Sequence, residues 1–435
     1  MKLLKVSVPN FRNLQNVELT FEPDLSPAVF PIASQNGGGK STLLQLIFIL
    51  FHCSVNKKRH QFINNFIGTS IQKNIELHFQ NVIDFALFKF YDYYRRKYIN
   101  LQFKIYQINN ENITSSSRQI AISSNIESIY KSIDYVINHY VDDVNIYREE
   151  RSQHIDNIYN CLTEVGDLIE NKSFQDDISK LNLLYIIPLS LSKEKHTHFL
   201  ALSSDSRDYE ENLVFSNLVG ERIFLAAPST QPYLFLDRKQ KRYLMSSLLE
   251  YYSCLIEASN ILQNLYLYNQ LTVKELIDTF IKARDKDWKQ ALKSNNLTYG
   301  SNIKQLTEDF HDFLGKDKYI LPTPELDSVI VQKQISETER IELEPEDLSH
   351  GELRRLGLYA WIKYNIPENS IILIDEVENA LHPDWQYNIA DELASWGNNQ
   401  YLLATHSFHL CEALTPKHVK EIEPKMCKPD SKAVD

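Results

Sequence analysis

The segment Ser34-Gln35-Asn36-Gly37-Gly38-Gly39-Lys40-Ser41-Thr42 contains three of the eleven glycines in this chain of 435 residues. Glycine allows backbone conformations and close approaches that a side chain would obstruct, so such a cluster in a glycine-poor chain indicates a special backbone role. The apolar run Val29–Ala33 precedes the cluster and predicts a buried strand. The almost wholly apolar run Thr42–Phe51 follows it and predicts a helix that is buried on most sides.

This order of strand, glycine-rich loop and helix predicts a phosphate-binding loop. Glycines let backbone N–H groups close around phosphate oxygens, and the helix N-terminus adds partial positive charge. Lys40 would reach the β- and γ-phosphates, and Ser41 would ligate Mg²⁺. Ser34 departs from the GxxxxGK[ST] pattern, which has glycine at that position. The residues of this loop expected to bind nucleotide are Asn36, Gly37, Gly38, Gly39, Lys40, Ser41 and Thr42.

A second signal is Ile371–Glu376, where four apolar residues are followed by two acids. The pattern is typical of a buried parallel strand. Asp375 at its carboxyl end would hold the Mg²⁺ shell, and Glu376 would polarise an attacking water. Many buried strands end in an acid by chance, so this signal gains its weight from the phosphate loop.

Two further signals flank this strand. Ser349, three residues before Glu352, predicts a capping box that opens a helix over 352–364. Such a helix start also presents N–H groups and a hydroxyl to an anion, which suits a γ-phosphate donated from another protomer. Ser349, Gly351 and Glu352 are therefore expected at the nucleotide. His406 follows the strand-like run 402–404 and stands in the order expected for a γ-phosphate sensor.

With these four motifs in this order, the sequence resembles the ABC-type ATPase heads of the SMC, Rad50, RecF and OLD class. The resemblance covers about 1–100 and 325–412. It implies a Walker A motif at 34–42, an LSxGE signature at 348–352, a Walker B motif at 371–376 and a switch histidine at His406. It further implies an α/β fold in which a P-loop mixed sheet carries an antiparallel β lobe and helical insertions, with ATP and Mg²⁺ as cofactors.

The resemblance also suggests roles for residues outside these motifs. Asn10–Asn13 looks like the N-terminal segment that places an arginine, here Arg12, by the nucleotide. Gln231 is the choice for the glutamine of the family's glutamine loop, with contacts to nucleotide and metal, although a plain turn is an equal alternative. The run Asp375–Pro383 is similar to DEPExxLHP, with Val377 replacing proline. A different interpretation of this run is a metal site formed by Glu378 and His382, four apart on one helical face.

Hydrophobic periodicity divides the remaining chain. Strands are expected at 4–8, 17–21, 75–79, 85–91, 99–106, 183–190, 222–236 and 329–331, and helices within 110–180 and 241–314. The segments that follow are a first part of the head with Walker A (1–110), a helical insertion (111–180), a strand-rich return to the head (181–240), a helical lobe (241–320) and a second part of the head with the remaining motifs (321–435).

Composition excludes several classes of protein. The formal net charge of −11 argues against a uniformly basic nucleic-acid-binding surface. Basic clusters at 57–59, 95–97 and 239–242 could still touch nucleic acid, and an ordinary surface is the alternative. Five scattered cysteines without a CxxC pair favour a reducing cytoplasm over a disulfide or zinc framework. No signal peptide and no long apolar run are present, so a membrane location is not expected.

The sequence between the motifs indicates which members of this ATPase class the chain resembles. Its helices are too short and irregular for the long arms of SMC or Rad50, few residues follow His406, and no nuclease motif is found, so we expect neither a TOPRIM domain nor an effector in this chain. This pattern looks like the stand-alone ATPase subunits of bacterial anti-phage systems, Septu-like or retron-associated. The partners expected are a second copy bound through an ATP sandwich, with a higher oligomer left open, and a separate nuclease or effector subunit. A RecF-like DNA-repair ATPase is the alternative, and a transporter ATPase is disfavoured.

Overall fold

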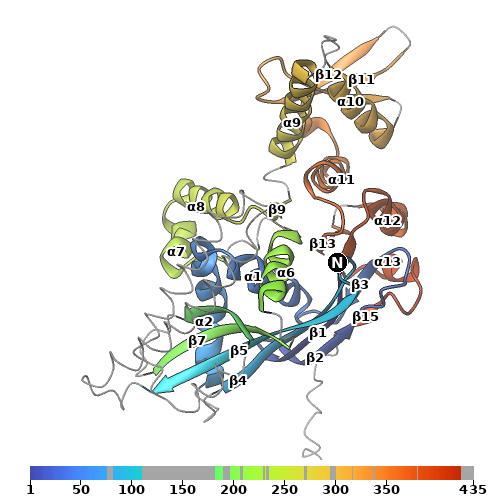
Figure 1. The fold of residues 1–435 in the computed structure, drawn as a ribbon. Coiled ribbons are helices and arrows are strands. Elements are labelled where there is room, and N and C mark those ends of the chain that lie inside the picture. The colour runs from blue at the N-terminus through green and yellow to red at the C-terminus, as the bar shows by residue number, and fades with distance from the viewer. Residues whose placement is uncertain are drawn as a thin grey trace, which may run out of the picture.

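The computed structural model describes residues 1–75, 82–109, 182–189, 196–205, 209–228, 231, 235–268, 272–293, 300–315, 317–336, 339–379 and 381–422. The helical insertion predicted within 110–180 lies outside these residues. No helix in the described ranges is long and apolar enough to cross a membrane. The described chain forms three sheets with helices packed on them (Figure 1).

A parallel sheet carries the motifs. Its strand order is β15-β3-β14-β13-β8-β9, and every neighbouring pair is parallel. Helices and a second sheet cover its two faces, which explains why its central strands are continuous apolar runs without polar alternation. The strands are β3 (Val29–Ala33), β8 (Ile223–Ala227), β9 (Leu265–Leu267), β13 (Ile371–Asp375), β14 (Gln400–Ala404) and β15 (Lys420–Glu421).

The second sheet is antiparallel, with strand order β2-β1-β4-β5-β7-β6. Together with the parallel sheet it gives the mixed α/β architecture expected for an ABC-type head, with the β lobe below the helices in Figure 1. The strands are β1 (Lys2–Phe11), β2 (Leu14–Thr20), β4 (Val82–Asp92), β5 (Lys97–Asn109), β6 (Asn182–Leu189) and β7 (His196–Ser204).

Helix α1 (Lys40–Ser54) fills the space between the two sheets. Thirteen of its fifteen residues are buried, as expected for a helix that is apolar around its whole circumference. Phe51 shows how α1 meets the β lobe, because its ring lies 4.8 Å from that of Phe88 and 5.4 Å from those of Phe90 and Phe103. The start of α1 is thereby fixed beside the carboxyl ends of the parallel strands.

The parallel sheet separates two hydrophobic cores. On β13, Ile371 and Leu373 face the core around α1, whereas Ile372 and Ile374 face a second core built by the C-terminal helices. A small antiparallel sheet packs in this second core, and Figure 1 shows it with α9 and α10 as a lobe projecting away from the β lobe. The elements on this side are α9 (Thr272–Lys293), α10 (Ser301–Leu314), β10 (Lys318–Pro322), β11 (Val329–Gln334), β12 (Arg340–Leu343), α11 (His350–Ala360), a π-helical turn (Trp361–Asn365), α12 (Pro383–Ser395) and α13 (Phe408–Glu412).

The remaining helices cover the side and ends of α1. They are a 3₁₀ turn (Lys57–Arg59), α2 (His60–Ile75), α6 (Tyr209–Arg222), α7 (Arg238–Ser246) and α8 (Leu248–Ile261), and a further 3₁₀ turn (Pro345–Asp347) precedes α11. Helices α2 and α6 pack directly on α1, and α7 packs on α8.

Most of the predicted elements are confirmed, and three are corrected. The strand expected to begin at Ile75 is wrong there, because α2 continues to that residue, and 76–79 lie outside the described residues. Among the described residues of the run 222–236, Ile223–Ala227 form a strand, and 229–230 and 232–234 lie outside the described residues. The helical region 241–314 is interrupted by β9, which adds an edge to the parallel sheet although its three residues are too few to show a period.

Truncation of Phe51 tests the packing of α1 between the sheets. Phe51→Ala should lower the unfolding free energy by about 3–5 kcal/mol, because the fully buried ring leaves a cavity that its aromatic neighbours cannot fill. The measurement is the urea unfolding midpoint. Tyr94→Ala is the control, since Tyr94 is 87% exposed and its loss should change little. Equal midpoints for the two variants would contradict the described core.

Candidate nucleotide-binding site

The glycine-rich loop curls around the side chain of Lys40. Lys40 Nζ donates to the carbonyl of Ser34 at 3.0 Å and to Ser34 Oγ at 3.2 Å. Gly37 and Gly39 have φ angles of 81° and 94°, in the left-handed region that favours glycine. A Cβ on Gly38 would lie 2.4 Å from Ser34 Oγ, so the serine at the first position requires glycine at the fifth.

The turn between β1 and β2 supports the loop from outside. Asn13 Nδ2 donates to the carbonyl of Gly37 at 3.0 Å, and a Cβ on Gly39 would lie 2.7 Å from Leu14 Cδ2. Arg12 stands at the same turn, with a φ of 52°. Its guanidinium lies 4.1 Å from the centre of the Phe66 ring and donates to the Phe66 carbonyl at 2.6 Å. The predicted arginine segment therefore adjoins the loop, with Arg12 engaged on α2.

The three residues predicted as metal ligands meet at the end of β13. Ser41 Oγ donates to Asp375 Oδ1 at 3.0 Å, and Gln231 Nε2 donates to Asp375 Oδ2. Gln45, one turn further along α1, donates its amide N–H to the side-chain oxygen of Gln231. The structure thus brings together residues that are 334 and 144 positions apart in the chain.

Burial controls the charge of this cluster. Desolvation raises the pKa of Asp375 to about 6, although hydrogen bonds from Ser41 and Gln231 act in the opposite direction. Glu376 and Glu378 add to the rise because they are like charges nearby. Burial also lowers the pKa of Lys40, and the three carboxylates oppose that change. A divalent cation at this point would favour the ionised Asp375.

The donors fit Mg²⁺ carried by a nucleotide phosphate. A serine hydroxyl, a carboxylate and an amide oxygen are hard oxygen ligands, and Mg²⁺ usually takes few protein ligands beside waters and phosphate oxygens. The described residues contain no group of three or more His, Cys, Asp and Glu side chains that could hold a metal by themselves. Because Gly37–Gly39 have no Cβ atoms, no side chain there obstructs the approach of a phosphate to the backbone N–H groups.

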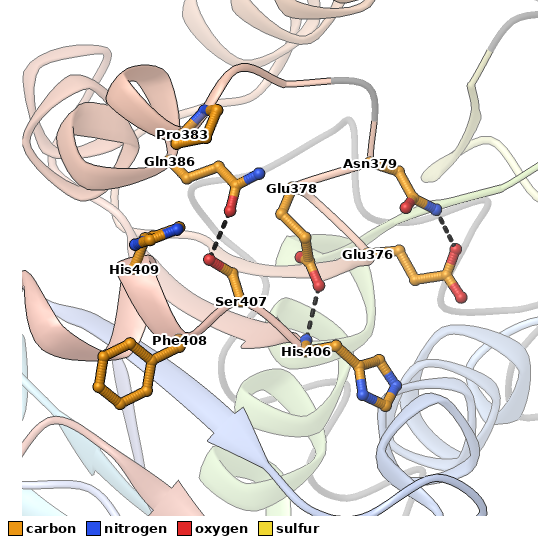
Figure 2. A pocket seen from close by; sticks show the side chains of 9 residues that line it. All are labelled: Glu376, Glu378, Asn379, Pro383, Gln386, His406, Ser407, Phe408 and His409. Atoms are coloured by element: carbon orange, nitrogen blue, oxygen red, sulfur yellow. Dashed lines mark hydrogen bonds between the residues drawn. The ribbon is translucent and has the colours of Figure 1, made fainter.

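Glu376 is held in an uncommon backbone conformation. Its φ is 54°, which is rare for a residue other than glycine and costs free energy unless neighbours fix it. The N–H of Glu376 donates to the Ala404 carbonyl at 2.9 Å, and its carbonyl accepts from Arg354. Asn379 Nδ2 donates to Glu376 Oε2 at 2.6 Å, as Figure 2 shows. These bonds hold the backbone and the carboxylate of Glu376 in place after β13.

His406 and Glu378 join the ends of two strands beside this carboxylate. The backbone N–H of His406, after β14, donates to Glu378 Oε1 at 2.6 Å. Glu378 Oε2 is buried and has no hydrogen-bond partner among the described residues. In Figure 2 the ring of His406 points away from Ser407 and Phe408. A pocket of about 450 Å³ opens here, lined by Glu376, Glu378, Asn379, Pro383, Gln386, His406, Ser407, Phe408 and His409.

The alternative metal site at Glu378 and His382 is wrong. Glu378 lies in the turn after β13, and His382 is the N-cap of α12, where its Nδ1 accepts from the N–H of Asp384 at 3.3 Å. The two residues therefore do not share a helical face, because the helix on which the interpretation depended begins only at Pro383.

The predicted capping box at Ser349 is confirmed. Ser349 Oγ accepts from the N–H of Glu352 at 3.2 Å, and Glu352 Oε2 accepts from the N–H of Ser349 at 3.1 Å. Glu352 also forms an ion pair with Lys318 of β10. In the part of the chain that the structure describes, no hydrogen bond joins the group Ser349, Gly351 and Glu352 to the glycine-rich loop.

Sequence reasoning missed four residues that support the site, namely Asn13, Gln45, Arg354 and Asn379. Gln45 carried a signal, because it is the one polar residue within Leu43–Phe51 and is 1% exposed. A buried polar side chain needs a partner, and Gln231 supplies it. Arg354 is also buried, with its guanidinium 3.7 Å from the centre of the Tyr268 ring. Asn13 and Asn379 lie in turns and carried no comparable signal.

This fold and these motifs define an ATPase of the AAA/ABC class with an ABC-type head. The chain belongs to the family described as "AAA domain, putative AbiEii toxin, Type IV TA system", whose model matches residues 35–412.

Individual relatives are more distant. The chain is 27% identical to the Retron Ec83 probable ATPase of Escherichia coli over 164 residues, which are 35% of this chain and 29% of that protein. It is also 27% identical to the energy-coupling factor transporter ATP-binding protein EcfA1 of Staphylococcus aureus over 157 residues, 35% of this chain and 54% of that protein. The chain thus spans about a third to a half of these relatives. An SMC head bound to the C-winged helix domain of ScpA aligns at a TM-score of 0.41 and 10% identity, covering 95% of this chain and 92% of that one.

The burial of Asp375 predicts a pH-dependent stability in EDTA without nucleotide. Its folded-state pKa of about 6 lies above the usual unfolded value of about 3.9, so ionisation destabilises the fold. The penalty is absent below about pH 4 and complete above about pH 6. Asp375→Asn should therefore raise the unfolding free energy at pH 8 by about 2–3 kcal/mol more than at pH 4.

Urea unfolding across this pH range gives the measurement, and Asp391→Asn on the exposed side of α12 is the matched control. A difference between Asp375→Asn and the parent chain that stays constant with pH would contradict the assigned charge state.

Proposed function

We propose that the chain binds ATP with Mg²⁺ and hydrolyses it as a nucleotide-gated switch. The observation that carries this proposal is that Ser41 and Gln231 both donate hydrogen bonds to the buried carboxylate of Asp375. Ser41 directly follows Lys40, whose ammonium group is held by the glycine-rich loop. This arrangement has the groups that a metal-bound triphosphate requires, which are oxygen ligands for the metal, the ammonium group of Lys40 and the glycine-rich backbone of Gly37–Gly39.

Each residue has a distinct task in this proposal. Lys40 exchanges its bonds to Ser34 for phosphate oxygens, while Ser41, Asp375 and Gln231 orient the metal side of the triphosphate. Mg²⁺, when bound, neutralises charge on the β- and γ-phosphates. Glu376 accepts a proton from the attacking water, because its carboxylate is fixed by Asn379 and projects beyond β13. His406 donates to the γ-phosphate from the end of β14.

The second half of the site is proposed to come from another copy of the chain. The capping box at Ser349 ties Glu352 to the start of α11, so the helix N-terminus is ordered and can accept an anion. No described hydrogen bond joins it to the glycine-rich loop of its own chain. A homodimer with two bound nucleotides would complete two sites at once, so only the closed dimer gains these contacts and nucleotide shifts the population towards it.

A role in anti-phage defence is the biological part of the proposal. The similarity to the Retron Ec83 probable ATPase supports it, over the third of this chain that aligns. In this role the chain is the ATPase subunit, and a separate nuclease or other effector responds to closure of the dimer. We place no effector chemistry on the described residues.

Substitution of Glu376 and Lys40 should separate hydrolysis from binding. Glu376→Gln should keep MgATP affinity and lose hydrolysis by about 10²-fold or more, because an amide cannot accept the proton from water. Lys40→Ala should lose MgATP affinity, because the phosphates lose their cation. Fluorescent-nucleotide titration and phosphate release are the two measurements. An equal loss of affinity in both variants would refute these roles.

A mixing experiment tests the shared site. Lys40→Ala and Ser349→Arg should each be inactive as homodimers, whereas a mixed dimer contains one site with both residues intact. Mixing equal amounts should therefore restore ATPase activity to a sizeable fraction of the parent value. Thermal unfolding checks that Ser349→Arg still folds, since loss of the cap alone costs about 1 kcal/mol. Failure of two folded variants to complement would show that the site lies within one chain.

A further inference from the structure

The helical hairpin formed by α7 and α8 follows Gln231 in the chain and lies at the side of the molecule (Figure 1). Helix α7 has nine residues, and none of them is buried. Its start is nevertheless well defined, because Asp237 and Gln240 form a complete capping box. Of the apolar residues of α7, Tyr243 is partly buried and packs against the core, whereas Leu244 and Met245 face solvent. Most of this short helix is therefore exposed, although helices of this length gain their stability mainly from tertiary contacts.

Helix α8 has apolar residues on two faces. Tyr251, Leu255 and Ala258 are buried and hold it on the molecule. A second stripe faces solvent and continues onto the end of α7, where Met245 is 91% exposed, while Leu249 of α8 is 80% exposed. Within α8, Leu248, Tyr252 and Ile256 follow one another at intervals of four residues, which places them on one helix face suited to packing. Its members are Leu244, Met245, Leu248, Leu249, Tyr252 and Ile256.

Basic side chains border this apolar stripe. Arg238, Lys239 and Arg242 are exposed on α7, and α7 contains no acidic residue. Arg238 precedes Met245 by seven residues and Arg242 precedes it by three, so all three lie on one helical face. In the described part of the chain no carboxylate pairs with Arg238, Lys239 or Arg242. The surface is apolar at its centre and positive at one edge.

The hairpin is also joined to the nucleotide loop by a short series of contacts. The Phe235 ring, just before α7, lies 5.8 Å from the ring of Phe66, and the Phe235 carbonyl accepts from Asn65 Nδ2 at 3.0 Å. The guanidinium of Arg12 lies over the Phe66 ring, and the neighbouring Asn13 donates a hydrogen bond to the Gly37 carbonyl. A partner bound to the α7–α8 hairpin would therefore be connected, through Phe235 and Phe66, to the β1–β2 turn that supports the glycine-rich loop.

We propose that the α7–α8 surface docks an acidic amphipathic helix of a separate protein. Its apolar stripe would receive the apolar face of that helix, and Arg238, Lys239 and Arg242 would pair with acids along one edge. Exposed Met and Tyr side chains suit such a contact, because both are adaptable or amphipathic groups enriched at protein interfaces. The proposal rests on the proposed function for the existence of a partner subunit, but not on hydrolysis.

A second copy of this chain is a poorer occupant. A two-fold contact would bring the same patch of both copies together, so the three basic residues of α7 in one copy would need acids from the other copy, where α7 has none and α8 offers the two exposed acids Glu250 and Glu257. An acidic helix satisfies the apolar centre and the positive edge together. An anionic membrane or nucleic acid would satisfy the positive edge, and the test below distinguishes both.

Site-specific photocrosslinking in the native host tests this proposal. The photoreactive residue p-benzoylphenylalanine replaces Leu249, and in a second strain it replaces Trp288, which is 59% exposed on α9 and serves as the control position. We expect a protein adduct at 249 and none at 288. Mass spectrometry of the crosslinked peptide should identify a segment with apolar residues at helical spacing and acids on one flank.

Charge reversal then tests the chemistry of recognition. Arg238→Glu with Arg242→Glu should reduce the adduct at 249 by about tenfold, because attraction at the edge becomes repulsion. Lys286→Glu with Lys289→Glu is the matched pair on α9 and should leave the adduct unchanged. Reversing the partner's acids to lysine should restore the adduct with the first pair. The Glu376→Gln background should also retain it, which separates docking from hydrolysis.

Several results would overturn the proposal. These are an adduct with a second copy of this chain, with lipid or with nucleic acid, the absence of any adduct at 249, or a crosslinked segment that lacks acids and apolar helical spacing. An adduct that the charge reversal of α7 does not reduce would overturn it as well. Thermal unfolding of each variant shows whether the fold is intact, which the exposure of all substituted positions favours.

Discussion

The buried carboxylate of Asp375 is the constraint on which the arrangement of the site depends. Burying a charge costs free energy unless hydrogen-bond donors satisfy it, and here each oxygen receives one donor, from Ser41 and from Gln231. These donors belong to α1 and to the segment after β8, so the carboxylate is satisfied only when both pack against β13. The fold and the site are therefore established together, and neither sequence segment can form the site alone.

Helix α1 allows the fold and the site to form together, because it packs against both the parallel sheet and the β lobe. Its surface is apolar apart from its N-terminus and the buried polar residues Gln45, His52 and Ser54, so the helix can be enclosed by the β lobe on one side and the parallel sheet on the other. The glycine-rich loop before α1 has little freedom to move, because Leu14 packs closely against Gly39 and Asn13 donates a hydrogen bond to the Gly37 carbonyl. Rigid support of the loop follows from the same packing that stabilises the molecule.

Sequence patterns predicted what long apolar runs and local spacing determine. The run before the loop, the run ending at Asp375 and the capping box at Ser349 all specify local structure, and the structure contains each of them. They could not predict β9, because three residues show no period, or the end of the run 222–236, because turn and strand share its apolar composition. The support of Glu376 by Arg354 and Asn379 depends on how α11 and the turn after β13 pack, which no local pattern encodes.

The contacts around the loop give nucleotide binding a physical route to the α7–α8 surface. Arg12 is engaged on Phe66, whose ring contacts Phe235 just before α7, and Gln231, on the segment between β8 and α7, is engaged on Asp375. A triphosphate that recruits either side chain must replace these bonds with its own, so its binding free energy depends on the position of the segment between β8 and α7. By linkage, if nucleotide binding changes the affinity of a partner for α7, that partner changes nucleotide affinity by the same factor. The proposed docking surface and the nucleotide site would then be coupled through the segment between β8 and α7, which carries both Gln231 and Phe235.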